Sequence, residues 1–337
     1  MADRLRWGVL GAAYIASAKV IPAIQDSSNG VVVAIASRDP DKGRATARDF
    51  EISRVHTSYE ALIDDPKIDA IYNPLPNSLH AEWTIRAAEA GKAVLCEKPL
   101  ALNAADAERV VAACARHGVP LMEAFMYRFH PQNVRVQELL VEGVIGVVSE
   151  VRASLAVSLL GTPDPTNVRL QPALGGGTLL DMGCYAVSAA RLAFGEEPLR
   201  ALAWHDIDDR FGVDVAFAGI LEFNGRRPAT VSSSFKGGND GWYMIVGSEG
   251  IIEVPRAFIP GYGERAAEAL VIIADANSNR REEHFPPADH YRLMVEAFAN
   301  AVLTGQPVPY PPEDAVSNMR ALDALARSAR RNAADAV

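Results

Sequence analysis

The chain has 337 residues, of which 49% are hydrophobic and 22% are charged, and its formal net charge is -9. This composition is typical of a globular enzyme and excludes a disordered chain, while the acidic balance argues against nucleic acid as a partner. No apolar run reaches the roughly 18 residues that a membrane span needs. The length exceeds that of one ordinary core, so we expect two domains.

The first third of the chain alternates short apolar strands with helices. Strands are predicted over residues 5–10, 31–36, 69–72, 93–96 and 120–123, and helices over 11–26, 40–50, 78–90 and 104–117. Gly91 and Gly118 follow two of these helices, and Asp39 is expected to cap the helix that begins at Pro40. Strands separated by helices of this length predict a parallel, doubly wound sheet with right-handed crossovers.

After residue 124 the strands follow one another with few helices between them. Strands are predicted over 147–159, 199–207, 213–223, 229–235, 242–246, 251–254 and 269–274, and helices over 131–142, 178–193, 289–304 and 313–333. Several of these strands alternate apolar with polar residues, which is typical of an antiparallel sheet. We therefore predict an α/β dinucleotide-binding domain over residues 1–123 and an α+β domain with a mostly antiparallel sheet over residues 124–337.

The cysteines and the N-terminal residues indicate a cellular compartment. Cys96, Cys114 and Cys184 are widely spaced among apolar residues, which predicts buried thiols in a reducing compartment and neither a disulfide framework nor a metal site. The first residues lead directly into a strand and lack the apolar region of a signal peptide. We expect a cytoplasmic protein.

A glycine turn joins the first strand to the first helix, where the pyrophosphate of a dinucleotide would meet helix N–H groups. Gly11 matches the first glycine of the G-x-G-x-x-G pattern, while Ala13 and Ala16 replace the second and third. The alternative is a plain strand-to-helix turn, but its place at the start of the strand–helix array favours cofactor binding. The candidate cofactor residues here are Gly11, Ala12, Ala13, Tyr14 and Ile15.

The end of the second strand indicates which nucleotide binds. A carboxylate at this place favours NAD, because it accepts hydrogen bonds from the ribose 2′-OH and repels a 2′-phosphate. Here the strand ends in Ser37 and Arg38, and Lys42 follows one turn into the next helix. A hydroxyl and two cations suit a phosphate dianion. We therefore predict NADP as the cofactor, and NAD is the alternative.

Two further segments carry polar side chains in unusual places. Lys98 follows a buried strand and precedes Pro99, so its charge needs a partner or a function. In Gly175–Tyr185, three glycines precede a helix on which Asp181 and Tyr185 share one face. A structural role at the helix dipole and at a packed interface is the alternative for this pair, but the glycines favour a backbone that a ligand approaches closely. Together with the glycine turn, these segments predict a nicotinamide-dependent oxidoreductase.

Five motifs occur in one order along the whole chain: Gly11 to Ala16, Leu75 to His80, Glu97-Lys98-Pro99, Met126 to Pro131 and Gly175 to Tyr185. With these motifs the chain resembles the Gfo/Idh/MocA oxidoreductases, which are named for glucose–fructose oxidoreductase and inositol dehydrogenase. The resemblance implies a Rossmann domain followed by a domain with a large, mostly antiparallel sheet. It also implies a homodimer or homotetramer formed through that sheet.

The resemblance also assigns roles to individual residues. It makes Lys98 a catalytic residue that faces the nicotinamide, with Glu97 and Pro99 shaping the cofactor site. The loop that lines the cofactor after the third strand contains Pro74, Leu75, Asn77 and His80. Arg128 lies in the segment between cofactor and substrate, and we count it among the cofactor residues.

Tyr185 narrows the choice of substrate. The inositol dehydrogenase branch has histidine at this position, whereas tyrosine is similar to the branch of dimeric dihydrodiol dehydrogenase, NADP-dependent D-xylose dehydrogenase and glucose–fructose oxidoreductase. We therefore predict hydride transfer between NADP and a sugar or polyol, with an aldose of the D-xylose or D-glucose type oxidised at C1 to a lactone. The alternatives are a nucleotide-sugar ketoreductase, a trans-dihydrodiol dehydrogenase, or a non-enzymatic NADP-binding sensor or scaffold.

Oxidation at C1 requires a base for the hydroxyl proton. Free tyrosine has a pKa of about 10, which is high for a base at neutral pH, but a nearby ammonium and the positive nicotinamide favour the phenolate. We expect Tyr185 to accept the proton, Lys98 to stabilise the phenolate and Asp181 to orient substrate hydroxyls. The alternative exchanges the roles of Lys98 and Tyr185.

Overall fold

The computed structural model describes residues 4–161, 163–260 and 269–337, so the first three residues of the N-terminal stretch discussed above lie outside it. The chain divides into two compact units, and each is described by itself. The first unit comprises Met1–Met126 and Asp289–Val316, and the second comprises Tyr127–Ala288 and Ser317–Val337.

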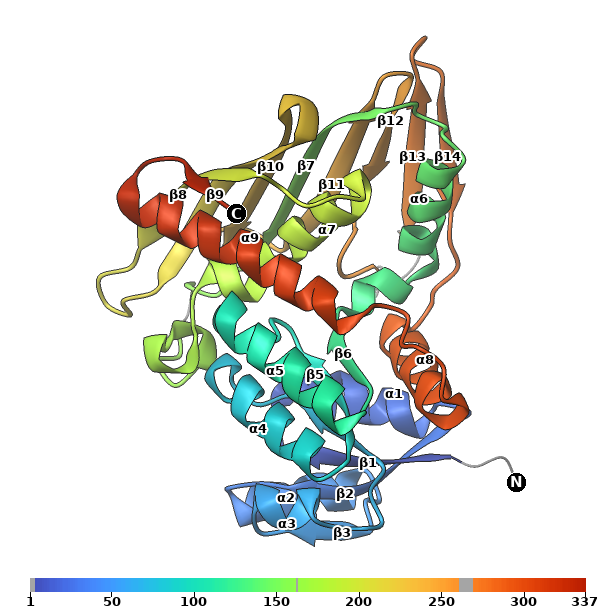
Figure 1. The fold of residues 1–337 in the computed structure, drawn as a ribbon, viewed down its shortest axis with the longest axis vertical. Helices are drawn as coiled ribbons and strands as arrows, with labels where there is room; N and C mark the ends of the chain where they lie inside the picture. Colours follow the sequence, from blue (N-terminus) through green and yellow to red (C-terminus); the bar gives the residue numbers. More distant parts are fainter. Residues whose placement is uncertain (1–3, 162, 261–268) are drawn as a thin grey trace. The chain divides into compact units, whose positions relative to one another are not determined.

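The first unit contains a six-stranded parallel sheet in the order β3-β2-β1-β4-β5-β6 (Figure 1). Its strands are β1 (Leu5–Leu10), β2 (Gly30–Ala36), β3 (Arg54–His56), β4 (Ala70–Asn73), β5 (Ala93–Glu97) and β6 (Leu121–Ala124). β4 is buried along its whole length, as expected for parallel strands that are covered on both faces. The predicted doubly wound sheet is confirmed. The short edge strand β3 was not predicted, and none of its three residues is fully buried.

The helices of this unit follow the predicted pattern except for the short helix α3, which was not predicted. They are η1 (Ala16–Val20), which is a π-helical turn, α1 (Ile21–Gln25), α2 (Pro40–Asp49), α3 (Tyr59–Ile63), α4 (Asn77–Glu89) and α5 (Ala104–His117). The predicted cap of α2 is confirmed, because Oδ1 of Asp39 accepts the N–H groups of Asp41 and Lys42 at 3.0 and 3.1 Å. Gly118, with φ of 64°, ends α5 in the left-handed region.

A helix from the last part of the chain also belongs to the first unit. The ring of Phe298 on α8 (His290–Thr304) lies 5.4 Å from that of Trp7 on β1. Nδ2 of Asn29 donates to the backbone oxygen of Glu296 at 2.9 Å. The alternation of elements does not indicate this return of the chain, and the domain boundary near residue 123 stays a prediction.

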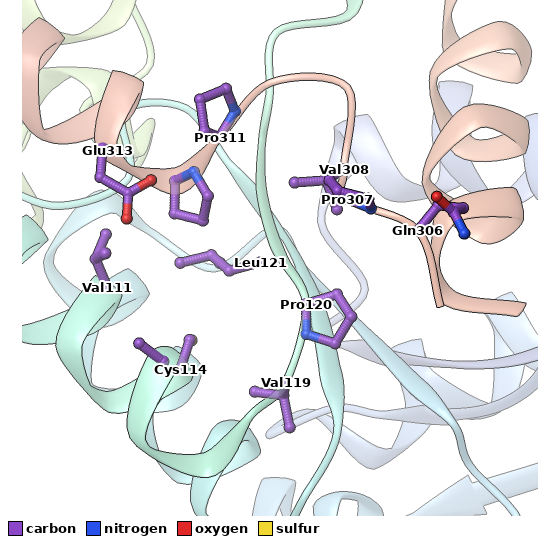
Figure 2. Close-up of a pocket in the computed structure, with 12 residues that line it drawn as sticks. Val111, Cys114, Val119, Pro120, Leu121, Gln306, Pro307, Val308, Pro311 and Glu313 are labelled. Atoms are coloured by element: carbon purple, nitrogen blue, oxygen red, sulfur yellow. The ribbon is translucent and has the colours of Figure 1, made fainter. Parts of the chain in front are cut away.

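The proline-rich link after α8 lies beside α5 and the amino end of β6. Figure 2 shows side chains of the link, α5 and residues 119–121 around a cavity of about 270 Å³. Val111 and Cys114 lie on the α5 side, and Pro307, Val308 and Pro311 on the link side. None of the predicted site residues lines this cavity.

In the second unit, the described residues form a nine-stranded sheet in the order β14-β13-β12-β11-β7-β10-β9-β8-β15. The strands are β7 (Val148–Ala156), β8 (Arg200–Ile207), β9 (Asp214–Phe223), β10 (Arg227–Ser234), β11 (Asp240–Gly247), β12 (Gly250–Val254), β13 (Leu270–Asp275), β14 (Arg280–His284) and β15 (Asp335–Ala336). β7 and β10 are parallel, and the other neighbours are antiparallel. The predicted mostly antiparallel sheet is therefore confirmed, while β14 and β15 were not predicted.

Helices cover one face of this sheet. The helices are α6 (Pro131–Val141), η5 (Leu179–Gly183), α7 (Cys184–Phe194) and α9 (Pro312–Arg331). There are also the short turns η2 (Met126–Phe129), η3 (Val168–Leu170), η4 (Pro172–Leu174) and η6 (Asn224–Arg226). η5 is a π-helical turn that runs directly into α7. α7 packs over β7, β10 and β11, and Ser328 of α9 accepts the N–H of Ala203 at 2.9 Å. On the other face, Leu202, Trp204 and Ile220 are 48%, 58% and 45% exposed.

Cys96, Cys114 and Cys184 are buried thiols, as predicted. Within the described ranges, no helix is long and apolar enough to cross a membrane. The same residues contain no group of histidine, cysteine and acidic side chains that could hold a metal ion.

Candidate active site

Lys98 directly follows β5, and the residue before it is held by a buried tyrosine. Oη of Tyr72, on the neighbouring strand β4, donates to Oε1 of Glu97 at 2.7 Å. Burial raises the pKa of Tyr72 well above its ordinary value, with the Glu97 carboxylate acting in the same direction, so the phenol keeps its proton and remains a donor. The hydrogen bond from Tyr72 therefore fixes the position of the Glu97 carboxylate beside the lysine. The Lys98–Pro99 peptide is cis.

The residues after the lysine are held from two other elements. The ring of His80, on α4, lies with Nδ1 2.7 Å from the Pro99 oxygen and Nε2 2.6 Å from the Leu75 oxygen. Burial lowers the pKa of His80 to about 4, although the two carbonyl oxygens favour the protonated ring. From β6, Oε1 of Glu123 accepts the N–H of Leu100 at 2.8 Å. Three elements thus fix the turn that presents Lys98.

The loop after β4 is fixed by the same kind of contact. Nδ2 of the fully buried Asn73 donates to the His80 oxygen at 3.2 Å, and its Oδ1 accepts the N–H of Leu75 at 3.3 Å. Pro74 and Leu75 are buried, whereas Asn77, at the start of α4, is half-buried. The Leu75 side chain reaches the glycine turn, because a Cβ built on Gly11 would lie 3.1 Å from its Cδ2.

The glycine turn places a left-handed glycine before a helix start. Gly11 has φ of 83°, a region that favours glycine, and its N–H donates to the Ala36 oxygen at 2.6 Å. The helix begins at Tyr14, and Ala13 before it has no side-chain acceptor that could cap the first turn. Ala12 is buried, Ala13 is half-buried and the Tyr14 side chain is 75% exposed. This turn and the uncapped helix start fit a dinucleotide pyrophosphate.

The candidate phosphate residues lie next to this turn. Ser37 is buried, and its Oγ accepts the N–H of Asp39 at 3.2 Å. Arg38 and Lys42 are exposed. Burial raises the pKa of Tyr59, while the Arg38 guanidinium beside its hydroxyl acts in the opposite direction. The same hydroxyl lies near the glycine turn, because a Cβ built on Gly11 would stand 3.5 Å from it. Tyr59 therefore links Arg38 to that turn.

In the second unit, Tyr185 and Asp181 lie one turn apart at the start of the helix η5–α7. The Tyr185 ring lies 5.8 Å from that of Tyr127 and 5.6 Å from that of Phe258, and it is 5% exposed. Nε of Arg169 donates to Oδ2 of Asp181 at 2.6 Å. The tyrosine therefore has a rigid aromatic surrounding, and the aspartate has an arginine partner.

Arg128 is bound to the same helix. Its Nη2 donates to Oγ of Ser188 at 2.7 Å, and Oη of Tyr127 lies 2.6 Å from the same oxygen. Only 3% of Arg128 is exposed. Its predicted cofactor contact stays a prediction, and the structure shows it as a residue that ties the segment before α6 to α7.

The structure thus gathers the predicted residues into two groups. The first unit holds the glycine turn, the phosphate residues, the loop after β4 and Lys98, all after the carboxyl ends of parallel strands, where ligands bind in sheets of this kind. The second unit holds Asp181, Tyr185 and Arg128. The pairing of Lys98 with Tyr185 stays a prediction.

Several residues of the site were not predicted. Tyr72, Asn73 and Glu123 lie in the last two positions of the buried strands β4 and β6, so a search for polar side chains at predicted strand ends would have found them. Arg169 and Ser188 carry no such signal, because their partners are distant in the sequence.

Comparison with known proteins identifies the class to which this fold and site belong. Residues 5–125 match the oxidoreductase family model with an NAD-binding Rossmann fold, and residues 133–253 match the Gfo/Idh/MocA C-terminal domain. The chain belongs to the Gfo/Idh/MocA oxidoreductase family. The predicted family is confirmed, and the chain is an NAD(P)-dependent oxidoreductase.

Relatives of several activities match nearly the whole chain. It is 42% identical to a D-xylose 1-dehydrogenase (NADP(+)) of Haloferax volcanii over 330 residues, 98% of this chain and 99% of the relative. A 3-ketoreductase from Actinomadura kijaniata, solved with NADP and TDP-benzene, superposes with a TM-score of 0.88 at 33% identity, covering 97% and 98% of the two chains. An aldose–aldose oxidoreductase from Caulobacter crescentus, complexed with glycerol, superposes with a TM-score of 0.89 at 29% identity, covering 99% and 100%.

Proposed function

We propose that the protein is an NADP-dependent aldose 1-dehydrogenase that oxidises a free sugar of the D-xylose or D-glucose type at C1 to its lactone. The observation that carries the proposal is the anchored Lys98 turn in the first unit, together with Tyr185 in a rigid surrounding in the second. The 42% identity to a D-xylose 1-dehydrogenase supports the substrate class. We further infer that the protein acts in the cytoplasm, on a small molecule and on neither nucleic acid nor membrane.

In this proposal each residue has one task. Bound NADP⁺ supplies the hydride acceptor. The Tyr185 oxygen accepts the proton of the C1 hydroxyl as the C1–H bond breaks, so the C1–O bond becomes the lactone carbonyl. The Lys98 ammonium favours the phenolate by its charge, and Asp181, held by Arg169, orients the sugar hydroxyls. The exchange of the Lys98 and Tyr185 roles remains the alternative.

The residues at the end of β2 support NADP over NAD. The Asp39 carboxylate caps α2 through two backbone N–H groups, so it is engaged with its own helix. Ser37, Arg38 and Lys42 then offer a hydroxyl and two cations for the 2′-phosphate. The glycine turn, with Gly11, Ala12, Ala13, Tyr14 and Ile15, would hold the pyrophosphate.

Two other enzymatic functions have support from relatives. The solved 3-ketoreductase bound to NADP and TDP-benzene favours a nucleotide-linked keto-sugar as the alternative substrate. A trans-1,2-dihydrobenzene-1,2-diol dehydrogenase of Xenopus tropicalis is 34% identical over 255 residues, 74% of this chain and 75% of the relative. An NADP sensor is the non-enzymatic alternative.

One substrate panel separates these functions. The purified protein is given NADP⁺ or NAD⁺ with D-xylose, D-glucose, other aldoses and trans-dihydrodiols, or NADPH with a TDP-linked keto-sugar, and the absorbance of the reduced nicotinamide is followed. We expect the highest kcat/KM with a free aldose and NADP⁺. Turnover only with dihydrodiols, or only of a TDP-linked keto-sugar with NADPH, would replace the proposal with the matching alternative, and tight NADP binding without any turnover would favour the sensor.

We also propose that the protein forms a homodimer or homotetramer through the sheet of the second unit. Leu202 pairs in register with Ile220, and Trp204 with Ala218, on the face that the described helices leave uncovered. Three adjacent, half-exposed apolar side chains are typical of a surface that a second copy covers.

A further inference from the structure

The three glycines before the catalytic helix are packed by the chain itself. Gly175 has φ of 77° and ends the short helix η4. A Cβ on Gly176 would lie 2.6 Å from the Arg169 oxygen, and one on Gly177 would overlap Oδ1 of Asp214. Each glycine therefore has a reason in the fold, and the ligand approach that the sequence suggests is not needed to explain them.

Asp214 reaches the first turn of the helix that carries Asp181 and Tyr185. It is the first residue of β9, and its Oδ2 accepts the N–H of Leu179 at 2.7 Å. The local sequence supplies no cap, because Gly177, which precedes the first helical residue Thr178, has no side chain. A side chain from a distant strand thus satisfies a backbone donor that every helix start exposes.

We propose that Asp214 is a positioning residue for Asp181 and Tyr185. Its carboxylate clamps the glycine turn and the first turn of the helix, and so sets where these two side chains stand. The expected effect of Asp214 on turnover rests on the proposed function. Its contact with the helix start, which we call the clamp, does not.

The contacts around the turn show how a shift at Asp214 would spread. Leu179 lies two residues before Asp181 and six before Tyr185 on one continuous helix. The N–H of Gly177 donates to the Arg169 oxygen at 2.9 Å, and the Arg169 side chain binds Asp181. Release of the turn would therefore move the helix start and the partner of Asp181 together. A displacement of about 1 Å at a reacting group is enough to cost about 100-fold in rate.

The hairpin before β9 offers a matched control. Asp208 lies in the same hairpin, but its carboxylate binds the backbone N–H and the guanidinium of Arg210. These bonds stay within the hairpin, so a substitution there tests the effect of losing a carboxylate without touching the helix. Asp214→Asn is the conservative variant, because the amide oxygen can still accept the N–H of Leu179.

The first measurement needs no substrate. Hydrogen exchange followed by mass spectrometry is carried out on the full-length wild type, D214A, D214N and D208A, with peptides that cover residues 176–184. We expect exchange in D214A to be about 10-fold faster in this segment, with D214N close to the wild type and D208A unchanged. Unchanged exchange in D214A overturns the clamp.

The second measurement is steady-state kinetics of the same variants with D-xylose and NADP⁺. We expect kcat of D214A to fall about 10- to 100-fold, with KM for NADP⁺ within about 2-fold of the wild type and D214N restoring most of kcat. Faster exchange with an unchanged kcat overturns the positioning role. If the wild type oxidises no sugar of the panel, the proposed function fails, and the exchange experiment alone decides on the clamp.

Discussion

Nδ1 of His80 lies 2.7 Å from the backbone oxygen of Pro99, the residue that follows Lys98. His80 belongs to α4 and is 1% exposed, so the ring lies within the core of the first unit and acts on the lysine through the backbone. The assignment of His80 to the cofactor loop stays a prediction. The contacts of its ring with the Pro99 and Leu75 oxygens explain why a histidine occupies this position. One ring spans the turns after β4 and β5, and a smaller side chain cannot reach both carbonyl oxygens.

Replacing His80 by phenylalanine should destabilise the first unit and lower activity together. The variant keeps an aromatic ring but removes the one N–H that the neutral imidazole donates to a buried carbonyl oxygen, which costs about 1–3 kcal/mol. Urea unfolding and kcat measure the two effects. His117→Phe, at the exposed end of α5, is the control and should change neither. A His80→Phe variant with the stability and kcat of the wild type would show that these contacts do not hold the Lys98 turn.

Replacing Lys98 by methionine should abolish turnover and spare cofactor binding. The side chain keeps much of its length but loses the charge that favours the phenolate, so we expect kcat to fall by about 10³-fold. NADPH binding, measured by fluorescence titration, should change little. Lys67→Met, at an exposed lysine, should behave like the wild type. Substantial turnover by Lys98→Met would remove Lys98 from the catalytic group.

Replacing Arg38 by alanine should weaken the preference for NADP. A charge-assisted contact to phosphate contributes about 1.5–3 kcal/mol, so kcat/KM with NADP⁺ should fall by about 10- to 100-fold, while the value with NAD⁺ should change little. The control is Arg48→Ala in the last turn of α2. An equal loss with both cofactors would mean that Arg38 does not contact the 2′-phosphate.

The pH dependence of stability should differ between the wild type and Asp214→Asn. Burial raises the pKa of Asp214 above its ordinary value of 3.8, although the N–H of Leu179 and the charge of His205 oppose the shift. The folded wild type therefore binds this proton more tightly than the unfolded chain does. Its free energy of unfolding should fall, relative to that of the variant, as pH rises from about 3.8 through the raised pKa.

Urea unfolding of both proteins across this pH range measures the difference. The gap should be constant at higher pH, where the carboxyl is ionised in both the folded and unfolded states. Parallel curves from acid to neutral pH would show that the Asp214 carboxyl titrates as in the unfolded chain.

Replacing Trp204 by glutamate should disrupt the proposed oligomer. The substitution places a charge at the centre of the exposed apolar group on β8 and β9, where a second copy would have to bury it without a partner. Light scattering after size-exclusion chromatography should give a dimer or tetramer for the wild type and a smaller species for the variant. Val141→Glu, at a 90% exposed valine on α6, is the control. A monomeric wild type would exclude the proposed interface.

The prediction from sequence succeeded where the signal is local. The apolar runs that became β1, β2, β4 and β5 are short, buried and bounded by helices, so their period and length define them. It failed for β3, none of whose three residues is fully buried. It also gave no fold-based reason for Gly176 and Gly177, because the atoms that pack against them belong to Arg169 and to Asp214 on β9, and no local pattern indicates either contact.

The sequence by itself determined the family, the two kinds of sheet and the cofactor class, and it named the candidate site residues, because motif order and hydrophobic period are properties of neighbouring residues. Only the tertiary structure decided what holds those residues in place. The turn that carries Lys98 is held by Tyr72, His80 and Glu123, which come from three different elements. The helix of Tyr185 is held by Asp214, which comes from a strand. Buried polar groups must find partners wherever the fold supplies them, and no local pattern records which partner that will be.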